Sequence, residues 1–393
     1  MVCDGPRACA QGLTVTVFSS RLPQQLAANA FSAAIADLRR RGVPLADLTV
    51  TNPTTVGLLY PRDLLRQLAN PAGLTYEPTP FGRRAAREII WRNPDQVVLT
   101  ASTSEAYSLL FKLLCDPGDA VLTPEPSYPL CELLTRLDAV DATPYRLEHH
   151  GVWSIDRDSV RRACTVHTRA LLVVSPNNPT GSMLRADDRE WLVSFASEHQ
   201  LALISDEVFV EYPIAPRPDA SSLLGEERVL TFTLGGLSKS AGLPQVKLGW
   251  IVVSGPSDQV AAALQRLEVM CDMYLSVSTP VQVAGPALIE AGALIRAAIR
   301  ARLMENYRAL LAAAERHPAI RVPAPEGGWS AVLQVPATIG EDALVLQLLQ
   351  DAHIIVHPGY FFDMSHGSHL IVSLLPDPRV FETSIARVME VSA

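Results

Sequence analysis

The chain has 393 residues, of which 48% are hydrophobic and 19% are charged, and its formal net charge is −8. This length allows one large domain or two of moderate size, and the composition is typical of a packed globular protein rather than a disordered chain. The negative charge balance, without any basic run, argues against nucleic acid as a partner. No apolar run reaches the roughly 20 residues that span a bilayer, so no membrane partner is expected.

Residues 1–13 lack a basic start followed by an apolar stretch, so no secretory signal is expected. The six cysteines are scattered along the chain without a CxxC pair. This distribution favours reduced thiols over a disulfide framework or a metal site. Together these features predict a cytoplasmic protein.

In chain order, residues 22–40 have the apolar spacing of a helix, and residues 83–92 can form a short helix that ends at Asn93-Pro94. Short apolar strands then alternate with helices. Strands are predicted at 96–100, 120–123, 169–175, 201–205, 229–234 and 248–253, and helices at 104–115, 130–137, 186–200 and 256–270. Strands that are almost wholly apolar are buried on both faces, which predicts an α/β fold with a mostly parallel sheet flanked by helices.

The pattern changes after residue 282. Residues 287–316 predict one long helix, and strands at 326–335 and 369–375, with a helix at 341–352 between them, predict a smaller α+β domain. We therefore expect an N-terminal arm with part of the small domain at 1–45, a large domain at 46–285 and a small C-terminal domain at 286–393.

Polar or aromatic side chains follow five of the predicted strands, where ligands bind in open α/β sheets. In strand order they are Ser102, Thr103 and Ser104; Tyr128; Asn177 and Asn178; Asp206 and Glu207; and Ser238 and Lys239. Each alone has a simpler explanation as a helix cap, a turn or a solvated charge. Together they supply a phosphate cradle at a helix start, an amide, a carboxylate and a lysine amine. This set matches what pyridoxal phosphate (PLP) requires.

Eight motifs in this chain resemble those of the class I and II aminotransferases, a family of fold-type I PLP enzymes. They are YEPTPFG (76–82), ASTSEAY (101–107), PSYP (126–129), SPNNPTG (175–181), SDEVF (205–209), LSKSAGLPQVKLGW (237–250), EGGW (326–329) and HPGYFF (357–362). They occur in family order over nearly the whole chain. The resemblance implies PLP as cofactor, amino acid and 2-oxo acid substrates, and a homodimer with shared active sites.

The same resemblance assigns roles to individual residues. Lys239 is the expected Schiff-base lysine and proton carrier, Asp206 the partner of the ring nitrogen, and Asn178 the partner of the phenolic oxygen. Tyr128 is expected to stack on the ring, and with Lys239 and Asp206 it completes the expected catalytic set. The remaining expected cofactor contacts, mainly to the phosphate, are Ser102, Thr103, Ser104, Ser238, Lys247 and, from the neighbouring subunit, Tyr76.

Several positions depart from the family pattern. Lys247 stands where an arginine is usual, which keeps the charge but loses the bidentate fork. Gly236 replaces a common phosphate-binding serine. Phe209 replaces a common tyrosine, for which Tyr212 is a candidate substitute.

The largest departure is in the last strand, where Ile371 stands at the position of the arginine that grips the substrate α-carboxylate. Candidates to replace that arginine are Arg21, His366, His369 and Arg379. An aminotransferase is the leading prediction. A PLP-dependent lyase, a β- or γ-replacement enzyme or a carbon–carbon bond-forming enzyme is the alternative, and an amine- or cofactor-sensing regulator is the non-catalytic one.

Overall fold

The structure is a computed structural model that describes residues 19–23, 27 and 29–393. Predictions for the start of the chain, including Cys3 and Cys9, lie outside the described residues. Part of the predicted helix 22–40 does so too. Its described part, α1 (Ala30–Arg40), begins only at Ala30. The reason is Asn29, whose side chain accepts a hydrogen bond from the Ser32 N–H at 2.8 Å and caps the helix there.

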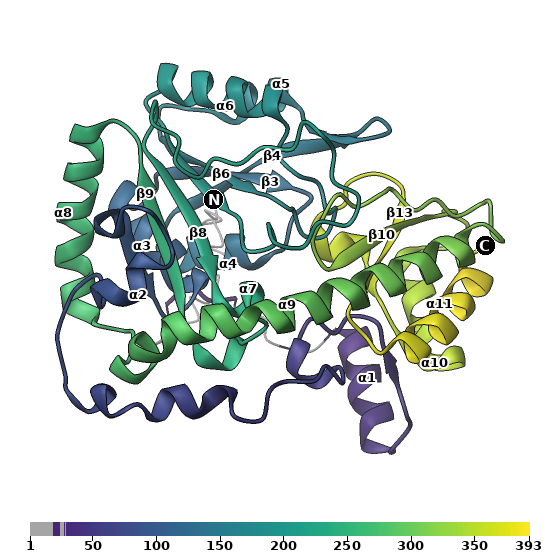
Figure 1. Cartoon of the computed structure of the whole chain (residues 1–393). Coiled ribbons are helices and arrows are strands. Elements are labelled where there is room, and N and C mark those ends of the chain that lie inside the picture. The colour runs from purple at the N-terminus through teal and green to yellow at the C-terminus, as the bar shows by residue number, and fades with distance from the viewer. Residues whose placement is uncertain (1–18, 24–26, 28) are drawn as a thin grey trace, which may run out of the picture.

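An eight-stranded sheet forms the centre of the larger part of the molecule (Figure 1). In spatial order its strands are β2 (Val97–Thr100), β9 (Gly249–Ser254), β8 (Thr231–Gly236), β7 (Ala202–Asp206), β6 (Thr168–Val174), β3 (Ala120–Glu125), β4 (Asp141–His149) and β5 (Trp153–Ile155). The run from β8 to β4 is parallel. Strand β9 is antiparallel to both of its neighbours, and β5 is antiparallel to β4. The predicted mostly parallel sheet is confirmed.

Helices cover both faces of this sheet. They are α2 (Arg84–Glu88), α3 (Thr103–Leu114), α4 (Leu130–Leu137), α5 (Arg157–Ala163), α6 (Ala186–Glu198), α7 (Leu237–Ser240) and α8 (Ser257–Tyr274). In β6, Ala170 and Leu172 belong to the core under α3 and α8, whereas Leu171 and Val173 belong to the core under α5 and α6. Successive side chains of a strand point to opposite faces, so a strand covered on both sides is apolar throughout.

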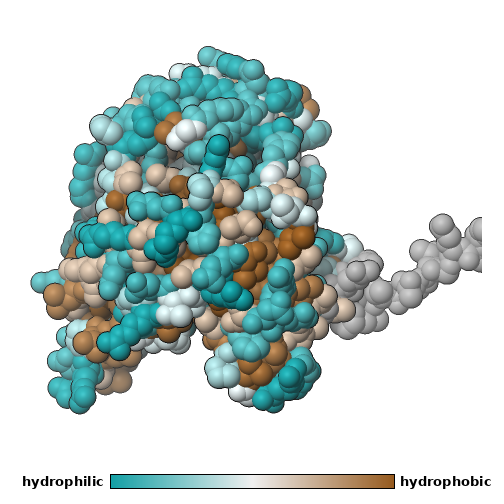
Figure 2. Space-filling view, turned by 90° about the vertical axis from the view of Figure 1, so that its right-hand side faces the viewer, coloured by the Kyte–Doolittle hydropathy of each residue, from teal (hydrophilic) through white to brown (hydrophobic). Residues whose placement is uncertain are grey.

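A three-stranded antiparallel sheet, in the order β10-β13-β12, forms the smaller part of the molecule. Its elements and those beside it are β10 (Ser330–Val335), α10 (Glu341–Ala352), β11 (Ile354–Ile355), β12 (His357–Pro358), β13 (Ser368–Ser373) and α11 (Pro378–Ser392). Strand β1 (Ala46–Asp47) pairs with β11, which brings an early segment of the chain to this unit. Figure 2 views the side that carries α10 and α11, where hydrophilic residues predominate and apolar ones gather in the lower half.

Helix α9 (Thr279–Ala314) extends from the larger part to the smaller part (Figure 1). It begins eight residues before the predicted 287, with Pro280 in its first turn, a position that suits proline. Within the described residues it is the one helix long and apolar enough to cross a membrane. However, Leu288, Ile295 and Leu303 on it are buried in the main core, as expected for a core helix.

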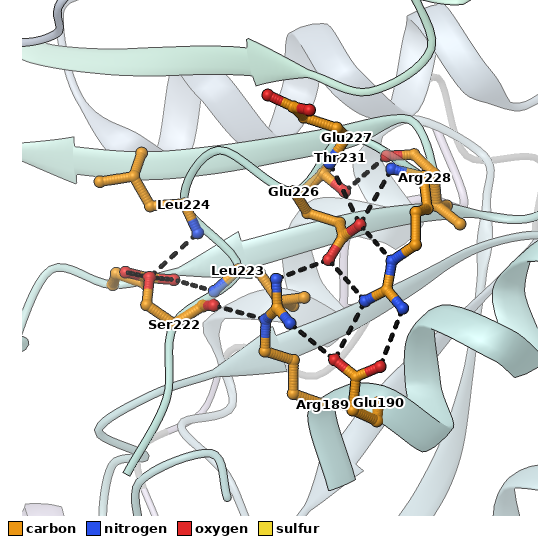
Figure 3. A network of polar contacts seen from close by, with 11 residues as sticks. Arg189, Glu190, Ser222, Leu223, Leu224, Glu226, Glu227, Arg228 and Thr231 are labelled. Atoms are coloured by element: carbon orange, nitrogen blue, oxygen red, sulfur yellow. Dashed lines mark hydrogen bonds and ion pairs between the residues drawn. The ribbon is translucent and has the colours of Figure 1, made fainter. Parts of the chain in front are cut away.

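A polar network anchors the loop between β7 and β8 to α6 (Figure 3). The Glu226 carboxylate, with only 2% of its side chain exposed, accepts hydrogen bonds from Arg189 at 2.6 Å and from Arg228 at 2.9 Å. Arg189 also donates to the Ser222 carbonyl at 2.9 Å. These two arginines hold the pKa of Glu226 low, at about 2. The network fixes the loop that leads into β8 and Lys239.

Candidate active site

A cleft of about 340 Å³ lies at the carboxyl ends of the central strands. It brings together five of the predicted site residues: Thr103, Tyr128, Asn178, Asp206 and Lys239. These residues come from five separate segments, and they meet because the strand ends share one edge of the sheet. The small sheet closes the opposite wall with Ser330, His357, Ile371 and Ser373.

Lys239 lies on α7, the short helix that follows β8. Its Nζ lies 4.5 Å from the ring centroid of Trp329 and 5.1 Å from that of Phe209. Burial of the amine lowers the pKa of Lys239 to about 8, against the opposing charge of Asp206. The residue as a whole is half-buried, yet its amine sits among aromatic rings. Near neutral pH this amine can therefore both release and accept a proton.

Asp206 ends β7, and its carboxylate is held by two hydrogen bonds. The Tyr107 hydroxyl donates to Oδ2 at 2.7 Å, and the Val208 N–H donates to Oδ1 at 3.2 Å. Burial raises the pKa of Asp206, whereas these donors and Lys239 oppose the rise. The cleft thus contains a buried carboxylate of fixed orientation together with a lysine amine.

Tyr107 and Trp329 contact the predicted catalytic residues, but no role was predicted for either. Tyr107 follows Thr103 at the i, i+4 spacing of one helix face, so the sequence did hold a signal for it. Trp329 is part of the EGGW motif, but nothing in that motif indicates that its ring contacts Lys239. Tyr212 is not a substitute for the missing tyrosine at Phe209, because its hydroxyl donates to the Lys239 carbonyl and it does not line the cleft.

Asn178 and Tyr128 line the cleft as expected. The Ser330 hydroxyl donates to Asn178 Oδ1 at 3.3 Å, which leaves the amide N–H groups of Asn178 free to donate elsewhere. Tyr128 is 47% exposed, and its ring centroid lies 6.2 Å from that of Phe362. A ring exposed at the mouth of a cleft has room to cover a flat ligand.

The predicted phosphate contacts are more dispersed. Ser102 caps α3, its Oγ accepting from the Glu105 N–H at 3.2 Å, and the first-turn N–H groups of Thr103 and Ser104 have no acceptor within the helix. Five residues of the predicted set do not line the cleft of their own chain: Tyr76, Ser102, Ser104, Ser238 and Lys247. Tyr76 is 67% exposed and Lys247 is also exposed. Their cofactor contacts stay predictions.

Ile371 lines the cleft but is only 1% exposed, because it packs against Val332 and Phe362. None of the four candidates for the missing arginine lines this cleft, so that expectation is wrong for the chain's own site. Arg21 donates to the Leu137 carbonyl at 3.0 Å, His366 and His369 line a different cleft, and Arg379 is exposed at the start of α11.

Comparison with known proteins agrees with this geometry. The alanine aminotransferase of Mycobacterium tuberculosis is 26% identical over 373 residues, which cover 90% of this chain and 86% of that protein. An S-alkyl-thiohydroximate lyase of Arabidopsis thaliana is 27% identical over 199 residues, or 50% of this chain and 43% of that protein. A crystal structure of an aminotransferase from Escherichia coli, 23% identical, shares the fold with a TM-score of 0.83 over 95% of this chain and 98% of that one.

The family profile Aminotransferase class I and II matches residues 82–378, most of the chain. That segment holds Lys239, Asp206 and every other predicted catalytic or cofactor-binding residue except Tyr76. The protein is an enzyme, and its chain belongs to the class I and II aminotransferases.

Proposed function

We propose that this enzyme is a PLP-dependent aminotransferase that moves an amino group between an amino acid and a 2-oxo acid, with Lys239 as its catalytic lysine. The observation that carries the proposal is the pairing, in one cleft, of a desolvated lysine amine with a buried carboxylate. Relatives named alanine aminotransferase support the same reaction class.

The residues of the cleft fit PLP. A buried carboxylate such as that of Asp206 is costly unless a positive charge lies beside it, and a protonated ring nitrogen would provide that charge. The free first-turn N–H groups of α3 and the Thr103 hydroxyl suit a phosphate. When bound, PLP would supply an electron-withdrawing ring that stabilises negative charge at the substrate α-carbon.

The protein's own groups would do the rest of the chemistry. Lys239 Nζ, with a pKa of about 8, takes the proton from the substrate α-carbon and returns it during transfer. The rings of Phe209 and Trp329 keep water away from that amine. Asp206 would hold the ring nitrogen protonated, and Tyr107 and Val208 hold Asp206 in place.

We assign the remaining cofactor contacts to Ser102, Ser104, Ser238 and Lys247, and to Tyr76 of a second copy in a cytoplasmic homodimer. The exposure of Tyr76, Leu74 and Leu59 supports a dimer, because Leu74 is 89% and Leu59 91% exposed, and a partner would cover them. We also keep residues 46–285 as the cofactor-binding domain and 286–393 as the small domain, with residues 1–45 as the N-terminal arm and part of the small domain.

Absorption spectroscopy tests the cofactor and its lysine. The purified protein mixed with PLP is expected to show a visible band that survives gel filtration, and Lys239→Ala is expected to lose it. Lys112→Ala is the matched control, because Lys112 lies on α3 beside Asp138, outside the cleft. A wild-type protein that stays colourless would refute the proposed cofactor.

An amino-donor screen on the coloured protein tests the reaction. An aminotransferase converts bound PLP to its amine form and releases one 2-oxo acid per site, which is measured directly. Release of ammonia from every active donor would instead favour the lyase alternative. Two observations motivate that alternative: the similarity of half of the chain to a lyase, and Ile371 at the position of the carboxylate-binding arginine.

A further inference from the structure

The missing arginine leaves few cations in the cleft. Among the described residues that line it, only Lys239 and His357 can carry a positive charge. Lys239 is assigned to the cofactor, so a substrate carboxylate has one remaining basic side chain to contact. His357 belongs to the HPGYFF motif, but that motif gave it no role.

Strand register places His357 directly beside Ile371. In the antiparallel pair β12–β13, His357 is the partner of Ile371, and directly opposed residues project to the same face of a sheet. On that face, two residues further along β13, Ser373 is paired with Ser330 of β10. All four residues line the cleft. His357 therefore extends from the position next to the one that the arginine would occupy.

Two aromatic rings fix the His357 imidazole. It stacks on Phe361 with centroids 4.9 Å apart and planes only 3° apart, and it meets Phe362 edge-on at 5.6 Å. It forms no hydrogen bond to another described side chain. Burial lowers the pKa of His357, with only the Asp47 carboxylate opposing this effect. The ring is thus an oriented donor without a protein acceptor, which is the state that a ligand anion would complete.

We propose that His357, together with the amide of Asn178, binds the substrate carboxylate in place of the arginine that Ile371 replaces. This inference rests on the proposed function. The Asn178 amide can contribute because its Oδ1 already accepts a hydrogen bond from the Ser330 hydroxyl. Its N–H groups remain free to donate to a carboxylate. Imidazole offers one N–H where guanidinium offers a fork, so the carboxylate is held by a single contact that depends on protonation.

Two small amines isolate the contribution of the carboxylate. Isopropylamine is 2-methylalanine with a hydrogen atom in place of its carboxylate. 2-Methylalanine has no α-proton to lose, and for isopropylamine the rapid initial spectral change, before any proton leaves its α-carbon, reports binding. Their dissociation constants are measured on the PLP-loaded enzyme from the change in its visible spectrum. The wild type is expected to bind 2-methylalanine the more tightly of the two at pH 5.5, below the ordinary pKa of imidazole. His357→Gln is expected to lose about tenfold of that preference, the size of one charge-assisted hydrogen bond.

His366→Gln is the matched control, because His366 follows the same segment but lines the neighbouring cleft. It is expected to leave the preference unchanged. A wild type with no preference, or a His357→Gln variant that keeps the full preference, would overturn the inference while the response to isopropylamine still shows a functional cofactor site. If neither amine changes the spectrum, the proposed function itself fails.

The preference for 2-methylalanine over isopropylamine is also measured as a function of pH. A histidine with a purely structural role would leave this pH dependence unchanged. The preference is greatest at low pH and falls as the pH rises through the pKa of His357. In His357→Gln it is flat. The other titratable groups at the cleft are Asp47, Tyr107, Tyr128, Cys131, Asp206 and Lys239. They act on both ligands through the same amine, so the ratio of the two dissociation constants largely cancels their effect. A wild-type ratio that does not change with pH would contradict the proposal.

Discussion

Tyr107→Phe tests how the fold holds the Asp206 carboxylate. The substitution removes the shorter of the two hydrogen bonds to that carboxylate, 2.7 Å against 3.2 Å for the Val208 N–H, and leaves the ring in place. A hydrogen bond to a charged group contributes about 1.5–3 kcal/mol. The same bond to the protonated, neutral carboxyl contributes only about 0.5–1.5 kcal/mol, so its loss costs the ionised form more and raises the pKa of Asp206 further.

The stability of the cofactor-free protein reports this change. Because burial already raises the folded-state pKa of Asp206 above its unfolded value, ionisation of Asp206 costs stability as the pH rises through the folded pKa. Tyr107→Phe enlarges that cost. The variant should therefore lose about 0.5–1.5 kcal/mol at low pH, where Asp206 is protonated, and about 1.5–3 kcal/mol in total at a pH at which Asp206 is ionised in both proteins.

Urea unfolding of both proteins between pH 5 and pH 8.5 measures the difference. Tyr145→Phe is the matched control, since Tyr145 is also buried but donates to a neutral acceptor, the Leu172 carbonyl, at 2.9 Å. Its loss should be about 1 kcal/mol at every pH. A Tyr107→Phe loss that is equally independent of pH would refute the inferred link between Tyr107 and the charge of Asp206.

Two further substitutions probe the surrounding fold. Glu226→Gln leaves the two arginines of Figure 3 without their buried carboxylate and should cost about 3 kcal/mol in urea unfolding at pH 7, against almost nothing for the exposed Glu227→Gln. The pKa of Glu226 is about 2 in the folded protein, below its value in the unfolded chain. The stability that its carboxylate contributes is therefore complete above the unfolded-state pKa and is lost as the pH falls towards 2. An effect of Glu226→Gln that grows on acidification would contradict this reasoning. In Gly235→Ala the added methyl group overlaps the Trp250 ring, and a cost of about 1–3 kcal/mol is expected. Gly340→Ala meets no atom and should cost less than about 1 kcal/mol, the effect of alanine at the N-cap of α10.

Much of the fold was predictable because its central strands are covered on both faces. Strands β6, β7 and β8 are mostly apolar and almost wholly buried, and their ends were predicted to within a few residues. Strand β4 was missed because it is only partly buried and lacks a continuous apolar run. The predicted start of α9 was too late, at residue 287, whereas the helix begins at Thr279 and contains both Pro280 and Pro286.

The site was predictable only where a residue follows a strand. Lys239, Asp206, Asn178 and Tyr128 were found in this way, and the structure gathers them in one cleft. His357 could not be found from spacing, because its position depends on the pairing of β12 with β13 across the small sheet. The candidates chosen instead, such as His369, were judged by charge alone, and their side chains belong to other surroundings.

The most direct test of the central claim is to find which lysine carries the cofactor. The chain has three lysines, Lys112, Lys239 and Lys247, so the answer is unambiguous. Borohydride reduction of the PLP-loaded protein fixes the cofactor to the amine that holds it, and mass spectrometry of the peptides locates the added mass. We expect the label on Lys239 alone. A label on Lys247 or Lys112, or an unlabelled Lys239 in a protein that has bound PLP, would contradict the account.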